Sequence, residues 1–406
     1  MPQVFTLLIF FLLVIEGFGI PFGHQAAILL CIILIPVLFV HMLFHKKFIF
    51  PKKATLLFLI FLIITLISTA FSVNVSNSFQ YLLFVLSTFF AFLISYNYKK
   101  QLEKPLVILI FTSSALFTIY YLILSSHLLN LYIPQNGYQF VYSGILSHNH
   151  LGDFLVLPSI LCIYYLYNRK HYSSAISYQL LSSVFCLLSI PFLVFSYSRS
   201  AYLSITLTIV LLHANYLQKK HSWSSRTVSR IVILITVIIT GFFIVATTRQ
   251  AAQQPYPSMV NKYLVQKGGL DKYKDLYGNR LEYISEALRS FQKRPIFGVG
   301  PDNFSSVSRK YSNIPTQVTS TAHSIFLEIL VGQGILGLLP FIGLILLILI
   351  KSRKNALYFV FLGMLINFQT DYTYQIYSFF LLFFVLAGII LSEKESPLPS
   401  STSLRE

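Results

Sequence analysis

One histidine and two arginines are the residues best suited to chemistry. His323 follows a long polar stretch and precedes an apolar run in which Gly334 and Gly337 complete the spacing His-Ser, nine residues, Gly-x-x-Gly. The exposed N–H groups at a helix N-terminus disfavour added positive charge, so the imidazole is expected to be neutral and able to accept a proton. His323 is therefore a candidate general base, although its position alone also fits a histidine that only satisfies a backbone group.

Two arginines favour the general-base interpretation of His323 over a purely structural one. Arg199 lies between two apolar runs in Ser198-Arg199-Ser200, and Arg280 lies in the polar stretch. An arginine at a membrane interface usually pairs with a phosphate or an acidic group, and for an isolated arginine a lipid headgroup is sufficient. Two arginines and His323 around one cavity instead predict an anionic leaving group held by guanidinium groups while an acceptor hydroxyl loses its proton.

The composition indicates the elements that must position these residues. Of the 406 residues, 55% are hydrophobic and only 11% are charged, which predicts an all-α polytopic membrane protein. Apolar runs of about 18–22 residues, long enough to cross a bilayer, recur along the chain. We predict twelve transmembrane spans, at 3–20, 25–44, 54–71, 79–96, 105–126, 150–167, 177–196, 200–217, 231–247, 323–350, 355–370 and 375–392.

The distribution of charge predicts the topology. The net charge of +17 is concentrated after even-numbered spans, where every junction carries lysine or arginine, whereas the short odd-numbered junctions contain Arg199 alone. The positive-inside rule then places both termini in the cytoplasm and the odd junctions outside, and a nucleic-acid partner is not expected. The predicted division is spans one to nine in 1–248, a large outer loop in 249–322, spans ten to twelve in 323–392 and a disordered cytoplasmic tail in 393–406.

An amphipathic helix is predicted within the outer loop. Asn279 can cap it, Glu282 follows three residues later as in a capping box, and Pro295 stops it. Its apolar positions recur at helical spacing, at Leu281, Ile284, Leu288 and Phe291. We expect this helix to lie on the outer membrane face.

Two further local features follow this helix. Gly298 and Gly300 predict a turn and not a nucleotide-binding loop, because no strand precedes them. Ser320 or Thr321 is expected to cap the helix that begins near His323.

Four groups of residues form a recognisable set of motifs. They are Asn149-His150-Leu151-Gly152, Ser198-Arg199, Asn279-Arg280 through Arg294-Pro295-Ile296-Phe297-Gly298-Val299-Gly300, and His323-Ser324 with Gly334-Ile335-Leu336-Gly337. Together these motifs resemble the O-antigen ligase/polymerase superfamily of bacterial envelope proteins, and the resemblance covers most of the chain. The final motif fits the ligase signature in which His is followed by Asn, Ser or Gln, nine residues and Gly-x-x-Gly.

The resemblance implies a multi-pass plasma-membrane glycosyltransferase of the GT-C type. It would move a glycan, with inversion, from an undecaprenyl-diphosphate carrier to an acceptor hydroxyl on the outer face, and would need no nucleotide, other cofactor or metal. Arg199 and Arg280 would bind the diphosphate, and His323 would be the base. Further candidates for substrate binding are Asn149, His150, Arg289 and Asp371; Asp371 is predicted outside, where it orients an arginine or His323 or forms a structural ion pair.

Several alternatives remain open. The acceptor is a glycan, a lipid or a protein, so a repeat-unit polymerase and a protein O-oligosaccharyltransferase are alternatives to a ligase. A lipid-linked oligosaccharide flippase would also have about twelve spans. The single late loop, with the candidate catalytic residues on one side of the membrane, favours an enzyme.

Overall fold

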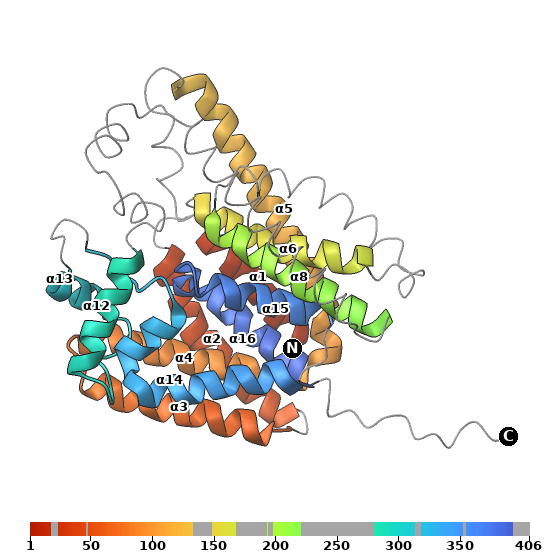
Figure 1. The fold of residues 1–406 in the computed structure, drawn as a ribbon. Helices are drawn as coiled ribbons and strands as arrows, with labels where there is room; N and C mark the ends of the chain where they lie inside the picture. The colour runs from red at the N-terminus through yellow and green to blue at the C-terminus, as the bar shows by residue number, and fades with distance from the viewer. Residues whose placement is uncertain are drawn as a thin grey trace.

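The computed structural model describes most of the chain as helices. It describes residues 1–17, 23–45, 48–132, 148–167, 193, 198–220, 280–312, 318–351 and 355–392. Within these residues every regular element is helical, with twelve α-helices and one short 3-10 helix (Figure 1). The predicted spans 177–196 and 231–247 lie outside the described residues apart from Leu193. So do residues 249–279 and 313–317 of the predicted outer loop, and the tail.

The helices follow the predicted order along the chain. The first seven are α1 (Pro2–Gly17), α2 (Gly23–His45), α3 (Lys52–Ala70), α4 (Val75–Asn97), α5 (Lys99–Tyr132), α6 (His148–Tyr167) and α8 (Arg199–Lys220). The remainder are α12 (Arg280–Lys293), α13 (Phe304–Tyr311), α14 (Ile325–Lys351), α15 (Ala356–Asn367), the 3-10 helix η3 (Thr373–Gln375) and α16 (Tyr377–Leu391).

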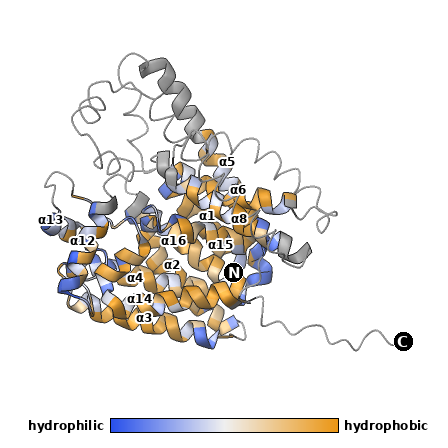
Figure 2. Ribbon diagram, viewed as in Figure 1, coloured by the Kyte–Doolittle hydropathy of each residue, from blue (hydrophilic) through white to orange (hydrophobic). Residues whose placement is uncertain are grey.

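Apolar helices form the bulk of the molecule, as Figure 2 shows by their hydropathy. Among the described helices, five are long and apolar enough to cross a membrane, within α2, α3, α4, α5 and α14, and α1, α6, α15 and α16 contain shorter apolar helices. All nine coincide with predicted spans, so the chain is a multi-pass membrane protein.

Helix α16 forms the centre of the bundle. All fifteen of its residues are buried, as expected for a helix that is apolar on every side. It packs closely on α4, because a Cβ at Gly388 would lie 2.1 Å from Ser95 Oγ. Helix α15 packs on both α6 and α8. These contacts bring the ends of helices distant in sequence to one place.

The two ends of the bundle hold different sets of contacts. At the predicted inner end, the backbone of Ile49 exchanges two 3.0 Å hydrogen bonds with the side chain of Asn97. At the other end, the Ser378 N–H donates to Glu16 (2.6 Å), and the Val73 N–H donates to the Val299 carbonyl (2.9 Å). Residues predicted on the same side therefore lie together.

Helix α14 is broken at Gly334, the first glycine of the Gly-x-x-Gly signature. Gly334 has φ 66°, and a Cβ there would lie 2.2 Å from the Ile296 carbonyl oxygen. The turn around Gly298 packs into this break: the Val299 N–H donates to the Val331 carbonyl, and the Ile335 N–H donates to the Pro295 carbonyl (2.9 and 2.8 Å). Glycine is needed at 334 because the conformation is left-handed and the approaching backbone leaves no room for a side chain.

The segment that contains α12 and α13 has a small core of its own. It joins α12, α13, the turn and the start of α14 through buried apolar residues, namely Ala287, Val299, Phe304, Val307, Ala322 and Val331. The predicted amphipathic helix is confirmed as α12, and Ile284 and Leu288 of its apolar stripe are exposed. Because Ala322 belongs to this core, the adjacent His323 is fixed relative to α12.

Candidate active site

His323 lies in a tight turn just before α14. Its φ is 52°, in the left-handed region that non-glycine residues rarely adopt. The turn is tied to the end of α15, where the Ile325 N–H donates to the Phe368 carbonyl (2.8 Å) and the Ser324 hydroxyl donates to the Gln369 side chain (3.0 Å). The expectation that Ser320 or Thr321 caps this helix is wrong, because α14 begins only at Ile325, after the left-handed residue.

The buried carboxylate of Glu328 also stabilises this turn. Glu328 accepts hydrogen bonds from the Ala322 N–H (2.8 Å) and from the Tyr374 hydroxyl (3.1 Å). Burial, followed by the negative charge of Glu328, raises the pKa of Tyr374, so its hydroxyl stays a donor. Through Glu328, Ala322 is held next to α14 and η3. These bonds maintain the left-handed backbone of the following residue, His323.

Aromatic rings enclose the imidazole of His323. The ring of Tyr283 on α12 stacks on it, with centroids 5.1 Å apart and planes 13° apart. Tyr372 contacts it edge to face at 4.9 Å and contacts His150 of α6 in the same way at 4.8 Å. The side chain of His323 remains 18% exposed, so it is oriented by its neighbours but still accessible to a substrate.

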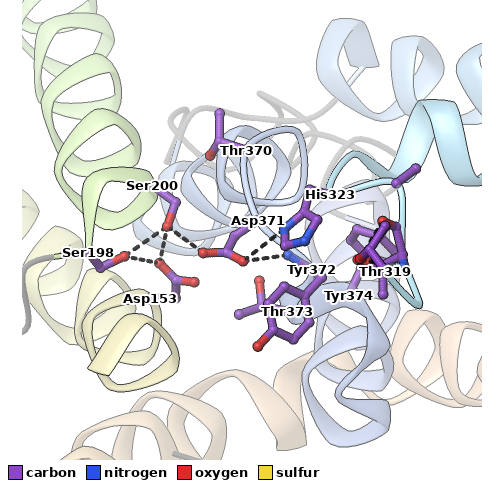
Figure 3. Close-up of polar contacts among 12 residues, drawn as sticks. Asp153, Ser198, Ser200, Thr319, His323, Thr370, Asp371, Tyr372, Thr373 and Tyr374 are labelled. Atoms are coloured by element: carbon purple, nitrogen blue, oxygen red, sulfur yellow. Dashed lines mark hydrogen bonds and ion pairs between the residues drawn. The ribbon is translucent and has the colours of Figure 1, made fainter. Parts of the chain in front are cut away.

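Asp371 is the acidic partner of His323. Its Oδ1 lies 3.7 Å from His323 Nδ1, an ion-pair distance longer than a hydrogen bond, and the Asp371 side chain is only 1% exposed. The same Oδ1 accepts the Tyr372 N–H (2.8 Å), and Oδ2 lies 3.0 Å from Ser200 Oγ. Figure 3 shows the carboxylate between the imidazole and the start of α8. This arrangement directs Nδ1 toward Asp371 and leaves Nε2 for another partner.

A second buried carboxylate continues the chain of polar contacts. Asp153 Oδ1, on α6, lies 2.9 Å from Ser198 Oγ and 2.8 Å from Ser200 Oγ. The two serine hydroxyl oxygens are themselves 2.8 Å apart (Figure 3). Through Ser200, Asp153 is therefore connected to Asp371 and the imidazole.

The backbone brings the three predicted catalytic positions together. Arg199 is the first residue of α8, between the two serines that contact Asp153. Arg280 is the first residue of α12, one turn before Tyr283, and positions three apart share a helix face. Each arginine position thus lies next to a residue that contacts His323 or its carboxylate partner.

The other predicted substrate-binding residues differ in how close they lie to His323. His150 and Asp371 both lie within this cluster, through Tyr372. Asn149 precedes His150 near the start of α6. Arg289 is exposed and donates to the Tyr311 carbonyl (3.1 Å), which directs it toward α13.

Sequence reasoning missed three contacts of this site. The sequence does not identify Tyr283 and Tyr372 as the rings that enclose His323, or Ser200 as a partner of Asp371. The available signals were local: Tyr283 is one helical turn after Arg280, Tyr372 follows Asp371, and Ser200 follows Arg199. None of these signals indicates which distant residue is contacted.

Comparison with known proteins identifies a family for part of the chain. No curated protein sequence matches the chain. The family model for O-antigen ligase matches residues 184–342. This match includes both arginines, His323 and the break of α14 at Gly334. The chain therefore carries an O-antigen ligase family domain at residues 184–342.

Proposed function

We propose that this protein is a membrane glycosyltransferase that moves a glycan from an undecaprenyl-diphosphate carrier to an acceptor hydroxyl. One observation carries the proposal: inside the matched domain, His323 is stacked on Tyr283 and directed toward the buried carboxylate of Asp371. A histidine oriented through Nδ1 by a carboxylate has its Nε2 available as a general base.

The proposed reaction is a direct displacement. His323 Nε2 takes the proton of the acceptor hydroxyl as its oxygen forms a bond to the anomeric carbon of the donor glycan. The bond between that carbon and the diphosphate oxygen breaks, and the electron pair leaves with the diphosphate. Attack from the side opposite the leaving group inverts the anomeric configuration.

Arg199 and Arg280 are the proposed diphosphate ligands. A departing diphosphate gains negative charge in the transition state, and guanidinium groups stabilise that charge through paired hydrogen bonds. Both arginines begin helices that contribute to the cluster around His323, which supports this role. His150 and Asn149 are proposed to line the donor site beside Tyr372, and Arg289 to bind the substrate farther out, near α13.

The proposed site faces the outer side of the plasma membrane. The basic residues after even-numbered spans support cytoplasmic termini, and His323 lies at the opposite end of the bundle from the Ile49–Asn97 contact. A donor carried by a lipid and an acceptor outside the cell can meet at such a site.

A reconstituted transfer assay tests the proposal. Purified full-length protein would receive one lipid-linked glycan and a panel of lipid, glycan and protein acceptors. We expect transfer to one acceptor class, and we expect His323→Ala and Arg280→Ala each to lower kcat by about 10²-fold or more, as loss of a general base or charge stabiliser does. If both variants retained wild-type transfer activity, the proposal would be wrong.

The same assay tests the mode of charge stabilisation. Because arginines supply the positive charge, chelation with EDTA is expected to leave the rate unchanged. Activity that is abolished by EDTA and restored by Mg²⁺ would contradict the arginine-based mechanism. Analysis of the anomeric configuration of the product would test inversion separately.

A further inference from the structure

The cluster of Asp153, Ser198, Ser200 and Asp371 contains fewer donors than its geometry requires. Four oxygen–oxygen distances of 2.8–3.0 Å join these side chains. Each serine hydroxyl carries one proton, and an ionised carboxylate carries none. With both carboxylates ionised, two protons must serve four contacts, and Ser200 Oγ can donate to only one of its two carboxylate neighbours.

One additional proton resolves most of this shortage. A protonated Asp153 donates to Ser200 Oγ, and Ser200 then donates to Asp371 Oδ2. The Ser198 hydroxyl then donates to Asp153 Oδ1 or to Ser200 Oγ. The contacts drawn in Figure 3 then form a chain of hydrogen bonds in which each group donates to the next, from Asp153 through Ser200 to Asp371.

The environments of the two carboxylates decide which of them holds the proton. Asp371 Oδ1 accepts the Tyr372 N–H at 2.8 Å, and a backbone N–H donor favours the ionised form. His323 Nδ1 lies 3.7 Å from the same oxygen, at an ion-pair distance. The hydrogen-bond partners of Asp153 Oδ1 are hydroxyls, which accept as readily as they donate. Two buried carboxylates on either side of one hydroxyl also repel each other when both are charged.

We infer that Asp153 is a neutral carboxylic acid that acts as a positioning residue. Through Ser200 it supplies a hydrogen bond that keeps Asp371 ionised and oriented toward His323. The inference rests on the proposed function only in assigning a catalytic role to His323. The protonation state itself concerns Asp153 and is measurable without activity.

Amide substitutions distinguish the two carboxylates. The amide of Asp153→Asn can still donate to Ser200, so this variant is expected to retain the kcat that Asp153→Ala loses. Asp371→Asn removes the charge beside His323 and is expected to lower kcat by about 10²-fold, the order a general base contributes. The opposite pattern, with Asp371→Asn active and Asp153→Asn inactive, would overturn the inference.

The intervening hydroxyl provides the matched comparison. Ser200→Ala breaks the chain and is expected to lower kcat about 10- to 100-fold, the effect of one hydrogen bond to a charged group, with the donor KM unchanged. Ser204→Ala is the control, because Ser204 is buried one turn farther along α8, beyond the hydroxyls that contact the carboxylates. Equal losses in Ser200→Ala and Ser204→Ala would indicate a general effect on α8 and contradict the inference.

Infrared spectroscopy provides the readout that is independent of turnover. In ester-free detergent, the holoprotein labelled with ¹³C-aspartate is expected to show an isotope-sensitive C=O stretch of a protonated carboxyl group. This band should disappear in Asp153→Asn and persist in Asp371→Asn. Absence of the band overturns the inference even if transfer activity is normal. If the band is present but His323→Ala remains fully active, the proposed function fails while the protonation of Asp153 stands.

Discussion

At the scale of single residues, the imidazole of His323 is controlled by contacts on several sides. Tyr283 stacks on one face, Tyr372 touches an edge, and Asp371 faces Nδ1. The left-handed backbone of His323 is held by the hydrogen bond from Ala322 to Glu328. In the proposed mechanism, this fixed position of His323 lowers the cost of reaching a reactive geometry.

The stacking of Tyr283 makes a prediction at this scale. An aromatic pair contributes about 0.5–1.5 kcal/mol beyond its buried area, so Tyr283→Ala is expected to lower kcat about 2- to 10-fold. Tyr283→Phe keeps the ring and should behave as the wild type. Phe291→Ala, on the same helix, is the control, and steady-state kinetics with varied acceptor is the measurement. Unchanged kcat in Tyr283→Ala would show that the stacking does not orient the base.

At the scale of elements, the break in α14 and the turn around Gly298 fit each other. Backbone N–H groups of the turn and of α14 bond across the break, and the Ser68 hydroxyl on α3 lies 2.6 Å from both the Phe297 and Gly332 carbonyl oxygens. The glycine signature after His323 is therefore a docking site for the segment that follows α12. It links the position of Tyr283 to that of His323.

Substitution of Gly334 tests this link. Gly334→Ala places a Cβ 2.2 Å from the Ile296 carbonyl oxygen, at φ 66° and ψ −166°. We expect a loss of about 1–3 kcal/mol from this backbone conformation, with a further loss from the clash. The variant should show a lower Tm in detergent and reduced transfer. Gly343→Ala in the same helix is the control, because its Cβ would meet only the end of the Leu57 side chain at 3.3 Å. Equal Tm values in the two variants would refute the docking role.

At the scale of the whole molecule, the buried helix α16 organises the bundle. It packs on α4, and α15, which precedes it, packs on α6 and α8. Glu16 at the end of α1 accepts the Ser378 N–H at the start of α16, so the first and last described helices are also joined. This packing places Asp371, in the turn before α16, beside the starts of α6 and α8.

Cysteine accessibility tests the orientation of the bundle. In a background with Cys31, Cys162 and Cys186 replaced by alanine, Lys310→Cys on α13 should react with a membrane-impermeant maleimide on intact cells. Lys53→Cys, at the other end of the bundle, should react only after permeabilisation. The reverse pattern would place His323 in the cytoplasm and exclude an outer-face acceptor.

Sequence reasoning reached the helices but only part of the site. Hydropathy predicted the apolar helices, and capping and spacing predicted α12, because these signals are local. The break at Gly334 depends on a turn more than thirty residues earlier in the chain. The contact between His323 and Asp371 likewise depends on how α14 and α15 pack, so the sequence could indicate that both are outside but not that they meet.

The extent of the family match has an evolutionary consequence. Residues 184–342 contain His323, but its carboxylate partner Asp371 lies beyond the matched segment, and Asp153 lies before it. Recombination that exchanged only the matched segment with a related gene would combine the histidine of one protein with the carboxylates of another. The two would not have evolved to pack against each other. Such chimaeras are expected to insert into the membrane and yet be inactive, so the segments on either side must be inherited together with it.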